Sequence, residues 1–219
     1  MPVEKELTIA IVGGTGSLGR GLALRLARPG IKVTIGSRDQ ARARQAADEL
    51  NQLLGGGSVE GKLNSEAIKE AEFIVIAVPY EGHEQMVREL EGGLKGKIVI
   101  DAVVPLRTGK PFVPPAGSAL QEAQQILGAD VPVVGALHNI SAVDLQDPHS
   151  SLGDILVSGD NDVAKEKVME IIRRLGARAF DAGPASNAYV IEGITGVLIY
   201  LNRKYKSKHA SIKITGIGE

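Results

Sequence analysis

Three glycines near the beginning of the chain have the spacing of a dinucleotide-binding turn. Gly14, Gly16 and Gly19 form the pattern G-x-G-x-x-G between an apolar run at 9–12 and a stretch with leucines at helical spacing. The first glycine permits a tight turn, the second lets a pyrophosphate approach the backbone, and the third lets helix and strand pack closely. Free N–H groups at the start of such a helix attract phosphate. The alternative is a glycine-rich turn that binds nothing, which the position between strand and helix disfavours.

The end of the second predicted strand indicates which dinucleotide is bound. Folds that prefer NAD place Asp or Glu there to hold the ribose 2′-hydroxyl. This chain has Ser37 and Arg38 instead, with a second cation, Arg42, one helical turn farther on. Because an arginine can hold a phosphate through two charged hydrogen bonds, the pattern favours the 2′-phosphate of NADP. Ser37 and Gln40 also have the spacing of a capping box for the next helix, and Asp39 suits its first turn; capping and phosphate binding can coexist.

Further chemistry is expected where other strands end, since ligands of open parallel sheets bind beside the carboxyl ends of the strands. Three such ends stand out, at 77–83, 101–105 and 136–142. His138 lies in the third and could orient a substrate ring or assist proton transfer, but a hydrogen-bonded structural histidine fits equally well. His83 begins a helix, where the dipole disfavours a charged imidazole. It is therefore either an exposed loop residue or a cofactor contact.

The composition excludes several classes of protein. The 219 residues include no cysteine, which rules out thiol catalysis, disulfides and cysteine-ligated metals. The four histidines lack the spacing of metal ligands, so no metal site is expected. A net charge of −1 argues against general nucleic-acid binding. The apolar run 194–201 is too short to span a membrane, and the short charged segment 1–6 does not resemble a signal peptide. We therefore expect a cytoplasmic protein without membrane contacts.

Strand and helix patterns alternate along the chain, which predicts an α/β fold with a Rossmann-like, doubly wound, mostly parallel sheet. Strands are expected at 7–12, 32–36, near 59, 73–78, 97–101, 131–137, 154–158 and 177–181, and helices at 18–27, 39–54, 65–70, 83–90, 118–127, 162–175 and 187–204. Asn64, Ser118 and the pair 186–187 are candidate N-caps. We expect an NADP-binding domain at 1–142 and a small C-terminal substrate region at 143–219 packed on it.

The last predicted helix and the tail after it have two features of their own. The helix carries apolar residues at helical spacing, which indicates a core face or the seam of a homodimer. The stretch 193–218 contains no acidic residue and several basic ones. Such a charge bias is typical of a solvated helix end, where cations favour the helix dipole. It would also suit an anionic second substrate.

Together these motifs resemble one family, the NADPH-dependent reductases of the deazaflavin coenzyme F420 (F420:NADP oxidoreductases) of archaea and some bacteria. The matching segments are 13–19, 21–27, 36–38, 78–81, 136–140 and 181–187, of which the last two are the more particular to the family. The resemblance implies reversible hydride transfer between C4 of the nicotinamide of NADP(H) and C5 of the deazaflavin. Since the cofactors carry this chemistry, no catalytic triad is needed.

The resemblance also implies roles for individual residues. They are Thr15, Gly16, Ser17 and Leu18 for the pyrophosphate; Ser37, Arg38 and Arg42 for the 2′-phosphate; Val78, Gly82 or His83, Val104 and Ala142 for the nicotinamide half; and His138, Ile140 and Ala210 for the deazaflavin. Tyr80 stands where the family often has tryptophan.

Two other functions are compatible with the same residues. A reductase of another small imine or ketone would need a proton donor beside the nicotinamide, for which His138 and Tyr80 are the candidates. A non-catalytic sensor would bind NADP(H) and signal through a partner, without turnover.

Overall fold

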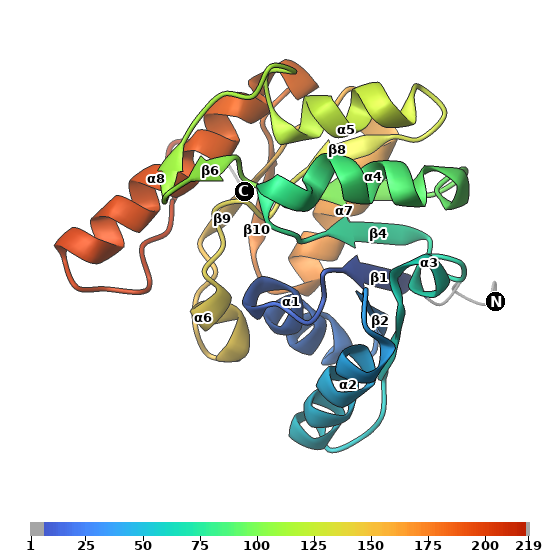
Figure 1. Cartoon of the computed structure of the whole chain (residues 1–219). Coiled ribbons are helices and arrows are strands. Elements are labelled where there is room, and N and C mark those ends of the chain that lie inside the picture. Colours follow the sequence, from blue (N-terminus) through green and yellow to red (C-terminus); the bar gives the residue numbers. More distant parts are fainter. Residues whose placement is uncertain (1–6, 218–219) are drawn as a thin grey trace.

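The computed structural model describes residues 7–217, and a six-stranded parallel sheet forms its centre (Figure 1). The strands lie in the order β3-β2-β1-β4-β5-β8. Their bounds are Thr8–Val12 for β1, Lys32–Ser37 for β2, Val59–Leu63 for β3, Phe73–Ile76 for β4, Ile98–Asp101 for β5 and Val133–Gly135 for β8. The predicted Rossmann-like α/β fold is confirmed. The expectation for the segment 1–6 lies outside the described residues.

Helices cover both faces of this sheet, because neighbouring side chains of each strand point into different cores. Ile11 of β1 packs with α1, α2 and α7 on one face, whereas Val12 packs with α3, α4 and α5 on the other. The helices are α1 Ser17–Ala27, α2 Gln40–Leu54, α3 Asn64–Ala67, α4 His83–Leu90, α5 Ala119–Leu127, α7 Asp162–Arg174 and α8 Ala188–Lys204. Burying the strands on both faces explains their nearly continuous apolar sequences.

The last two predicted strands lie outside the main sheet. They are β9 (Asp154–Val157) and β10 (Arg178–Asp181), and they form a separate parallel pair. An antiparallel bridge between Gly135 and Ser158 joins this pair to the end of β8. The C-terminal part of the chain is therefore attached at the carboxyl end of the central sheet.

Two short elements were not predicted. One is the hairpin of β6 (Leu106–Arg107) and β7 (Lys110–Pro111), and the other is the helix α6 (Ala142–Gln146). The helix depends on tertiary contacts, since the Arg25 guanidinium donates hydrogen bonds to carbonyl oxygens of α6 and of the loop after it, at Asp144, Leu145, Asp147, Pro148 and Ser150. A Cβ on Gly21 of α1 would lie 2.7 Å from Leu145 Cβ, so a glycine is needed for this close packing.

The tail after α8 returns to the body of the molecule and is held there by hydrogen bonds. Ser141 Oγ donates to the carbonyl of Lys208, and His209 Nδ1 lies 2.5 Å from Asp144 Oδ1. Farther along, the N–H of Asp154 donates to the carbonyl of Ile212. The basic tail is therefore fixed beside α6 and β9 (Figure 1).

The structure corrects several predicted helix starts. Asp39, not Ser37, caps α2, because its Oδ1 accepts the N–H groups of residues 41 and 42; Ser37 Oγ instead accepts the N–H of Asp39. Asn64 is the first residue of α3 and makes no cap bond, and Asn187 donates to the carbonyl of residue 182 rather than capping α8. The cap at Ser118 is confirmed, since its Oγ accepts the N–H of Gln121.

Candidate functional site

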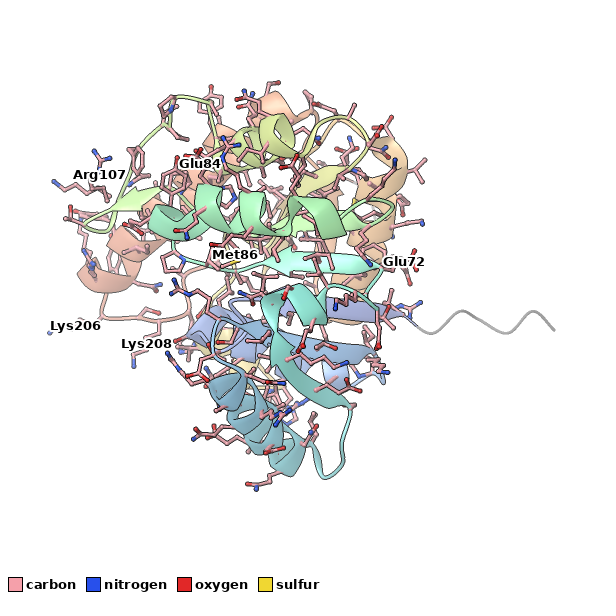
Figure 2. The ribbon with its side chains drawn as sticks, turned by 45° about the vertical axis from the view of Figure 1, so that its right-hand side comes forward. Glu72, Glu84, Met86, Arg107, Lys206 and Lys208 are labelled. Carbon is pink, nitrogen blue, oxygen red and sulfur yellow. The ribbon has the colours of Figure 1, made fainter. Side chains whose placement is uncertain are left out.

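A cleft of about 520 Å³ opens at the carboxyl ends of β1, β2 and β4. It brings together seven of the residues singled out in the sequence: Thr15, Gly16, Ser37, Arg38, Arg42, Val78 and Gly82. Its other lining residues include Asp39, Asn64, Glu81, Gln85, Met86 and Glu89. Figure 2 labels Met86, a residue of α4, near the middle of the molecule, below the ribbon of that helix. The cleft therefore lies where open α/β sheets bind their ligands.

The glycine turn forms the floor of the cleft, with one change from the predicted division of labour. The left-handed residue is Gly13, with φ +77°, so the tight turn is made one residue earlier than Gly14. A Cβ on Gly19 would lie 2.6 Å from Gly14 Cα, which is the expected close packing of helix on strand. Gly16 is exposed and precedes α1 without a side-chain cap. The first N–H groups of α1, at Ser17 and Leu18, are thus available to an anion.

The end of the cleft beside β2 carries the cations. Arg38 and Arg42 are exposed and line the cleft, whereas Ser37 is buried beside them. The carboxylate of Asp39 lies between the two arginines in sequence, but it is held by the N–H groups at the start of α2. No acid stands at the end of β2 itself, at Gly36 and Ser37. The local chemistry fits a phosphate on the ribose rather than a free 2′-hydroxyl.

The opposite wall is the segment from the end of β4 into α4. Val78 touches the glycine turn, since a Cβ on Gly13 would lie 2.8 Å from Val78 Cγ1. The short 3-10 turn η1 (Tyr80–Gly82) leads into α4, and one face of α4 lines the cleft through Gln85, Met86 and Glu89. This wall is the part of the cleft that the resemblance assigns to the nicotinamide half.

His83 lies on the other face of α4 and is fully buried, so the prediction of an exposed loop residue is wrong. Its Nε2 lies 2.7 Å from Asp101 Oδ2 and its Nδ1 lies 2.7 Å from Glu122 Oε1. Each ring nitrogen thus faces a carboxylate oxygen, an arrangement that favours the imidazolium with both nitrogens donating. Burial alone would lower the pKa of His83, but Asp101 and Glu122 raise it to about 9. The two carboxylates therefore outweigh the unfavourable effect of the helix dipole on the charged ring.

The histidine belongs to a larger hydrogen-bonded network, which we call the His83 network: Tyr80, His83, Asp101 and Glu122. The Tyr80 hydroxyl donates to Glu122 Oε2 at 2.8 Å, and Asp101 Oδ1 accepts the N–H of Val103 at 2.9 Å. Glu192 of α8 accepts the N–H groups of residues 119 and 120 at the start of α5. Burial raises the pKa of Glu192 to about 8. Burial and then the bond to Glu122 raise the pKa of Tyr80.

His138 is also buried, but its ring has no side-chain partner among the described residues. Neither ring nitrogen has a well-formed hydrogen bond within the described chain, although the Asp101 backbone acts on the ring. Burial lowers the pKa of His138 to about 4, against the opposing effect of Asp101. Only its carbonyl is engaged, by the Thr195 hydroxyl at 2.7 Å. The preceding residue, Leu137, has φ +68°, a backbone conformation that is costly for a branched side chain.

The other predicted contact residues lie beyond the lining of the cleft. Val104 is half-buried after β5, Ile140 is buried between β8 and α6, and Ala142 begins α6. The half-buried Ala210 of the tail donates its N–H to Asn202 Oδ1 of α8. The Ala142 carbonyl lies close to Gly21 of α1, so this residue packs on the helix that follows the glycine turn. Figure 2 places Lys206, Lys208 and Arg107 at the end of the molecule opposite Glu72, which precedes β4.

Sequence reasoning missed two groups of residues. Asn64 and Met86 enter the cleft from α3 and α4, and a Cβ on Gly36 would lie 2.6 Å from Asn64 Oδ1. The His83 network joins residues of four separate elements, which no spacing in the sequence could reveal. Within residues 7–217 no group of three potential metal ligands is found, and no helix is long and apolar enough to cross a bilayer.

Comparison with known proteins adds independent findings. A family model described as "NADP oxidoreductase coenzyme F420-dependent" matches residues 8–105. The chain is 39% identical to an F420-dependent NADP reductase of Methanocaldococcus jannaschii over 96% of this chain and 99% of that protein. It is 38% identical to the enzyme of the same name from Methanothermobacter marburgensis, over 97% and 100%. A crystal structure described as a candidate F420-dependent NADP reductase of Arthrobacter sp. FB24 superposes with a TM-score of 0.82, at 27% identity, over 96% and 100% of the two chains.

Proposed function

The chain belongs to the F420-dependent NADP reductase family, and on this premise we propose that it transfers a hydride reversibly between NADP(H) and the deazaflavin coenzyme F420. The observation that carries the proposal is that one cleft contains both the uncapped start of α1 and two exposed arginines, Arg38 and Arg42. The start of α1 follows β1 and the arginines follow β2, and these two strands are neighbours in the sheet. These features fit the pyrophosphate and the 2′-phosphate of NADP.

Each part of the cleft has a distinct task in this function. Thr15, Gly16, Ser17 and Leu18 hold the pyrophosphate, and Ser37, Arg38 and Arg42 hold the 2′-phosphate. Val78 and Gly82 border the nicotinamide half within the cleft, and the resemblance assigns Val104 and Ala142 to the same half from outside its lining. The His83 side chain faces away from the cleft, so any contact of this residue with the nicotinamide would come from its backbone. When bound, the nicotinamide and the deazaflavin supply the hydride donor and acceptor.

The second substrate is assigned to the region of His138. The two ring nitrogens of His138 and the hydroxyl of Ser158 are buried polar atoms without partners in the described chain, and a polar ring placed there would satisfy them. The resemblance assigns Ile140 and Ala210 to the same substrate. With its low pKa, His138 is neutral at pH 7 and can orient a ring without carrying a charge. Lys206 and Lys208 suit the anionic side chain of F420 (Figure 2).

The decisive experiment combines the protein with NADPH and oxidised F420 and follows the loss of deazaflavin absorbance. Bleaching is expected with NADPH and much less with NADH. NADPH binding without bleaching would favour the sensor, and oxidation of NADPH by an imine or ketone alone would favour the other reductase.

Arg38→Ala tests the choice of NADP. We expect the KM for NADPH to rise by about 10- to 100-fold, because a charged hydrogen-bonded contact contributes roughly 1.5–3 kcal/mol. The KM for NADH should hardly change. Arg44→Ala, an exposed arginine of α2 that does not line the cleft, is the control. Equal effects of Arg38→Ala on the two KM values would contradict the phosphate contact.

Three further expectations belong to this proposal. In the division into an NADP-binding domain at 1–142 and a substrate region at 143–219, the deazaflavin contacts both parts, through His138 and Ile140 of the first and Ala210 of the second. A homodimer is supported by four exposed apolar residues of α8, namely Tyr189, Val190, Val197 and Tyr200. Val197→Glu should convert a dimer to a monomer, as measured by light scattering.

A cytoplasmic location can be tested by fractionating the source cells.

A further inference from the structure

The His83 network lies directly behind the wall of the cleft. His83 and Gly82 are neighbours at the start of α4, yet Gly82 lines the cleft while the His83 ring points to the opposite side. Met86, one turn later, also lines the cleft. The first turn of α4 thus separates the cleft on one side from the imidazolium on the other.

The imidazolium connects this turn to two other elements. Through Asp101 it is joined to the end of β5, and through Glu122 to α5, each at 2.7 Å. Asp101 also fixes the segment after β5, since its Oδ1 accepts the N–H of Val103. Its main-chain carbonyl accepts the N–H of Ala136, just before the His138 segment. Asp101 therefore links the start of α4 with the segments that follow β5 and β8, which carry residues of the predicted nicotinamide and deazaflavin contacts.

The charge of the imidazolium strengthens its two hydrogen bonds. Both contacts of His83 are hydrogen bonds between ionised groups, which are shorter and about twice as strong as neutral ones. Tyr80 stacks on His83 with ring centroids 6.0 Å apart and donates its hydroxyl to Glu122, so η1 is held as well. Every ionisable group facing the imidazolium is thus an acid or a phenol: Asp101 from β5, Glu122 from α5, Tyr80 from η1 and, farther away, Glu192 from α8.

We propose that His83 is a positioning residue of the hydride transfer: clamped between Asp101 and Glu122, it sets the distance between the Val78–Gly82 wall and the Val103–Val104 segment that border the nicotinamide ring. This inference rests on the proposed function, since it takes the nicotinamide half to lie against that wall. The adenosine half is assigned to Arg38, Arg42 and the glycine turn, none of which makes a hydrogen bond with His83, Asp101 or Glu122. Hydride transfer depends on orientation, and a misplacement of about 1 Å can slow such a reaction by about 100-fold.

His83→Gln separates positioning from simple loss of the cofactor site. Three quantities are measured: the dissociation constants of NADPH and of 2′,5′-ADP, which lacks the nicotinamide half, and kcat with F420. We expect kcat to fall by about 100-fold and NADPH binding to weaken by about tenfold, with 2′,5′-ADP binding unchanged within about twofold. The exposed His149 of the loop after α6 makes its hydrogen bond to Asp147 through its main-chain N–H, and His149→Gln should leave all three unchanged.

The unaltered protein provides a second measurement that does not depend on the folding of a variant. NADPH binding should weaken as the pH rises past about 9, where His83 loses its proton, whereas 2′,5′-ADP binding should not. Glu192 ionises at a lower pH, at about 8, and Glu192→Gln removes its contribution. The loss above pH 9 should persist in Glu192→Gln.

The outcomes are distinct. Equal weakening of NADPH and 2′,5′-ADP, in His83→Gln or at high pH, would overturn the positioning role, as would kcat and NADPH binding that stay within twofold of the original. If His83→Gln does not fold, the pH dependence of the two ligands decides alone. If F420 is never reduced although NADPH and 2′,5′-ADP respond as expected, the proposed reaction fails while the clamp on the nicotinamide wall stands.

Discussion

The two buried histidines at the carboxyl end of the sheet have opposite electrostatic states. His83 is wedged between two carboxylates and keeps its proton, with a pKa of about 9, whereas His138 has no partner for either ring nitrogen and a pKa of about 4. Burial lowers the pKa in both cases. Only the contacts of Asp101 and Glu122 reverse it at His83.

The difference assigns different tasks to the two sites. A histidine whose nitrogens are both engaged cannot exchange partners without breaking an ion pair, so His83 suits a fixed structural connection. His138 is neutral and unsatisfied, and a buried polar group without a partner costs about 1–3 kcal/mol. Such a cost is expected where a ligand completes the site. Our proposal therefore assigns a structural connection to His83 and a substrate contact to His138.

The largest test of this comparison is removal of the charged ring. His83→Ala leaves two carboxylates facing each other in the interior, and breaking a buried pair in this way costs about 3–5 kcal/mol. Urea unfolding at pH 7 should show this loss in the free energy of unfolding. The exposed His149→Ala should remain within about 0.5 kcal/mol of the original. A small effect at His83 would mean that the ring is not charged.

A second test uses pH instead of mutation. The folded pKa of His83 is about 9, against 6.5 for an ordinary histidine, so its contribution to stability is complete below about pH 6.5 and is lost as the pH rises through 9. A difference of this size corresponds to on the order of 3 kcal/mol. Because the pKa of Glu192 is raised from 4.5 to about 8, its effect lowers the stability as the pH rises from about 4.5 to 8 and causes little further change above that range. Thermal unfolding between pH 8 and 10 should therefore report His83.

The control for the pH test is the same titration of His83→Gln. Its stability should change much less between pH 8 and 10 than that of the original protein. An identical loss in both proteins would show that another group titrates there, and the contrast between the two histidines would then lose its electrostatic basis.

The sequence predicted the dinucleotide end of the site better than either histidine. The glycines, Ser37 and Arg38 all act locally, because each lies within a turn or one helix start, and local spacing determines where such residues lie. The structure brings them into one cleft. Even there the tight turn moved to Gly13 and the helix cap to Asp39, because Asp and Ser are equally good caps and neighbouring positions differ little.

The histidine environments were inaccessible to the sequence for a physical reason. The partners of His83 are 18 and 39 residues away, on a strand and on a helix that meet α4 only in the folded protein. Helix α6 likewise depends on Arg25, about 120 residues earlier. Periodicity detects which face of an element is buried, but it carries no signal for which charges meet there.

The smallest expected effect concerns His138. Glutamine has a similar length and an amide that is never charged, so His138→Gln should change the stability at pH 7 by only about 1 kcal/mol. The acid side differs more. His138 has a folded pKa of about 4 against the ordinary 6.5, so the unfolded chain takes up a proton first and stability is lost as the pH falls from about 6.5 to 4. Urea unfolding at pH 7, 5.5 and 4.5 should show that His138→Gln loses less stability with falling pH than the original protein. His83→Gln should lose as much stability as the original, because the His83 ring of the original protein is already protonated throughout that range. An acid slope that depends on His83 instead would invert the comparison.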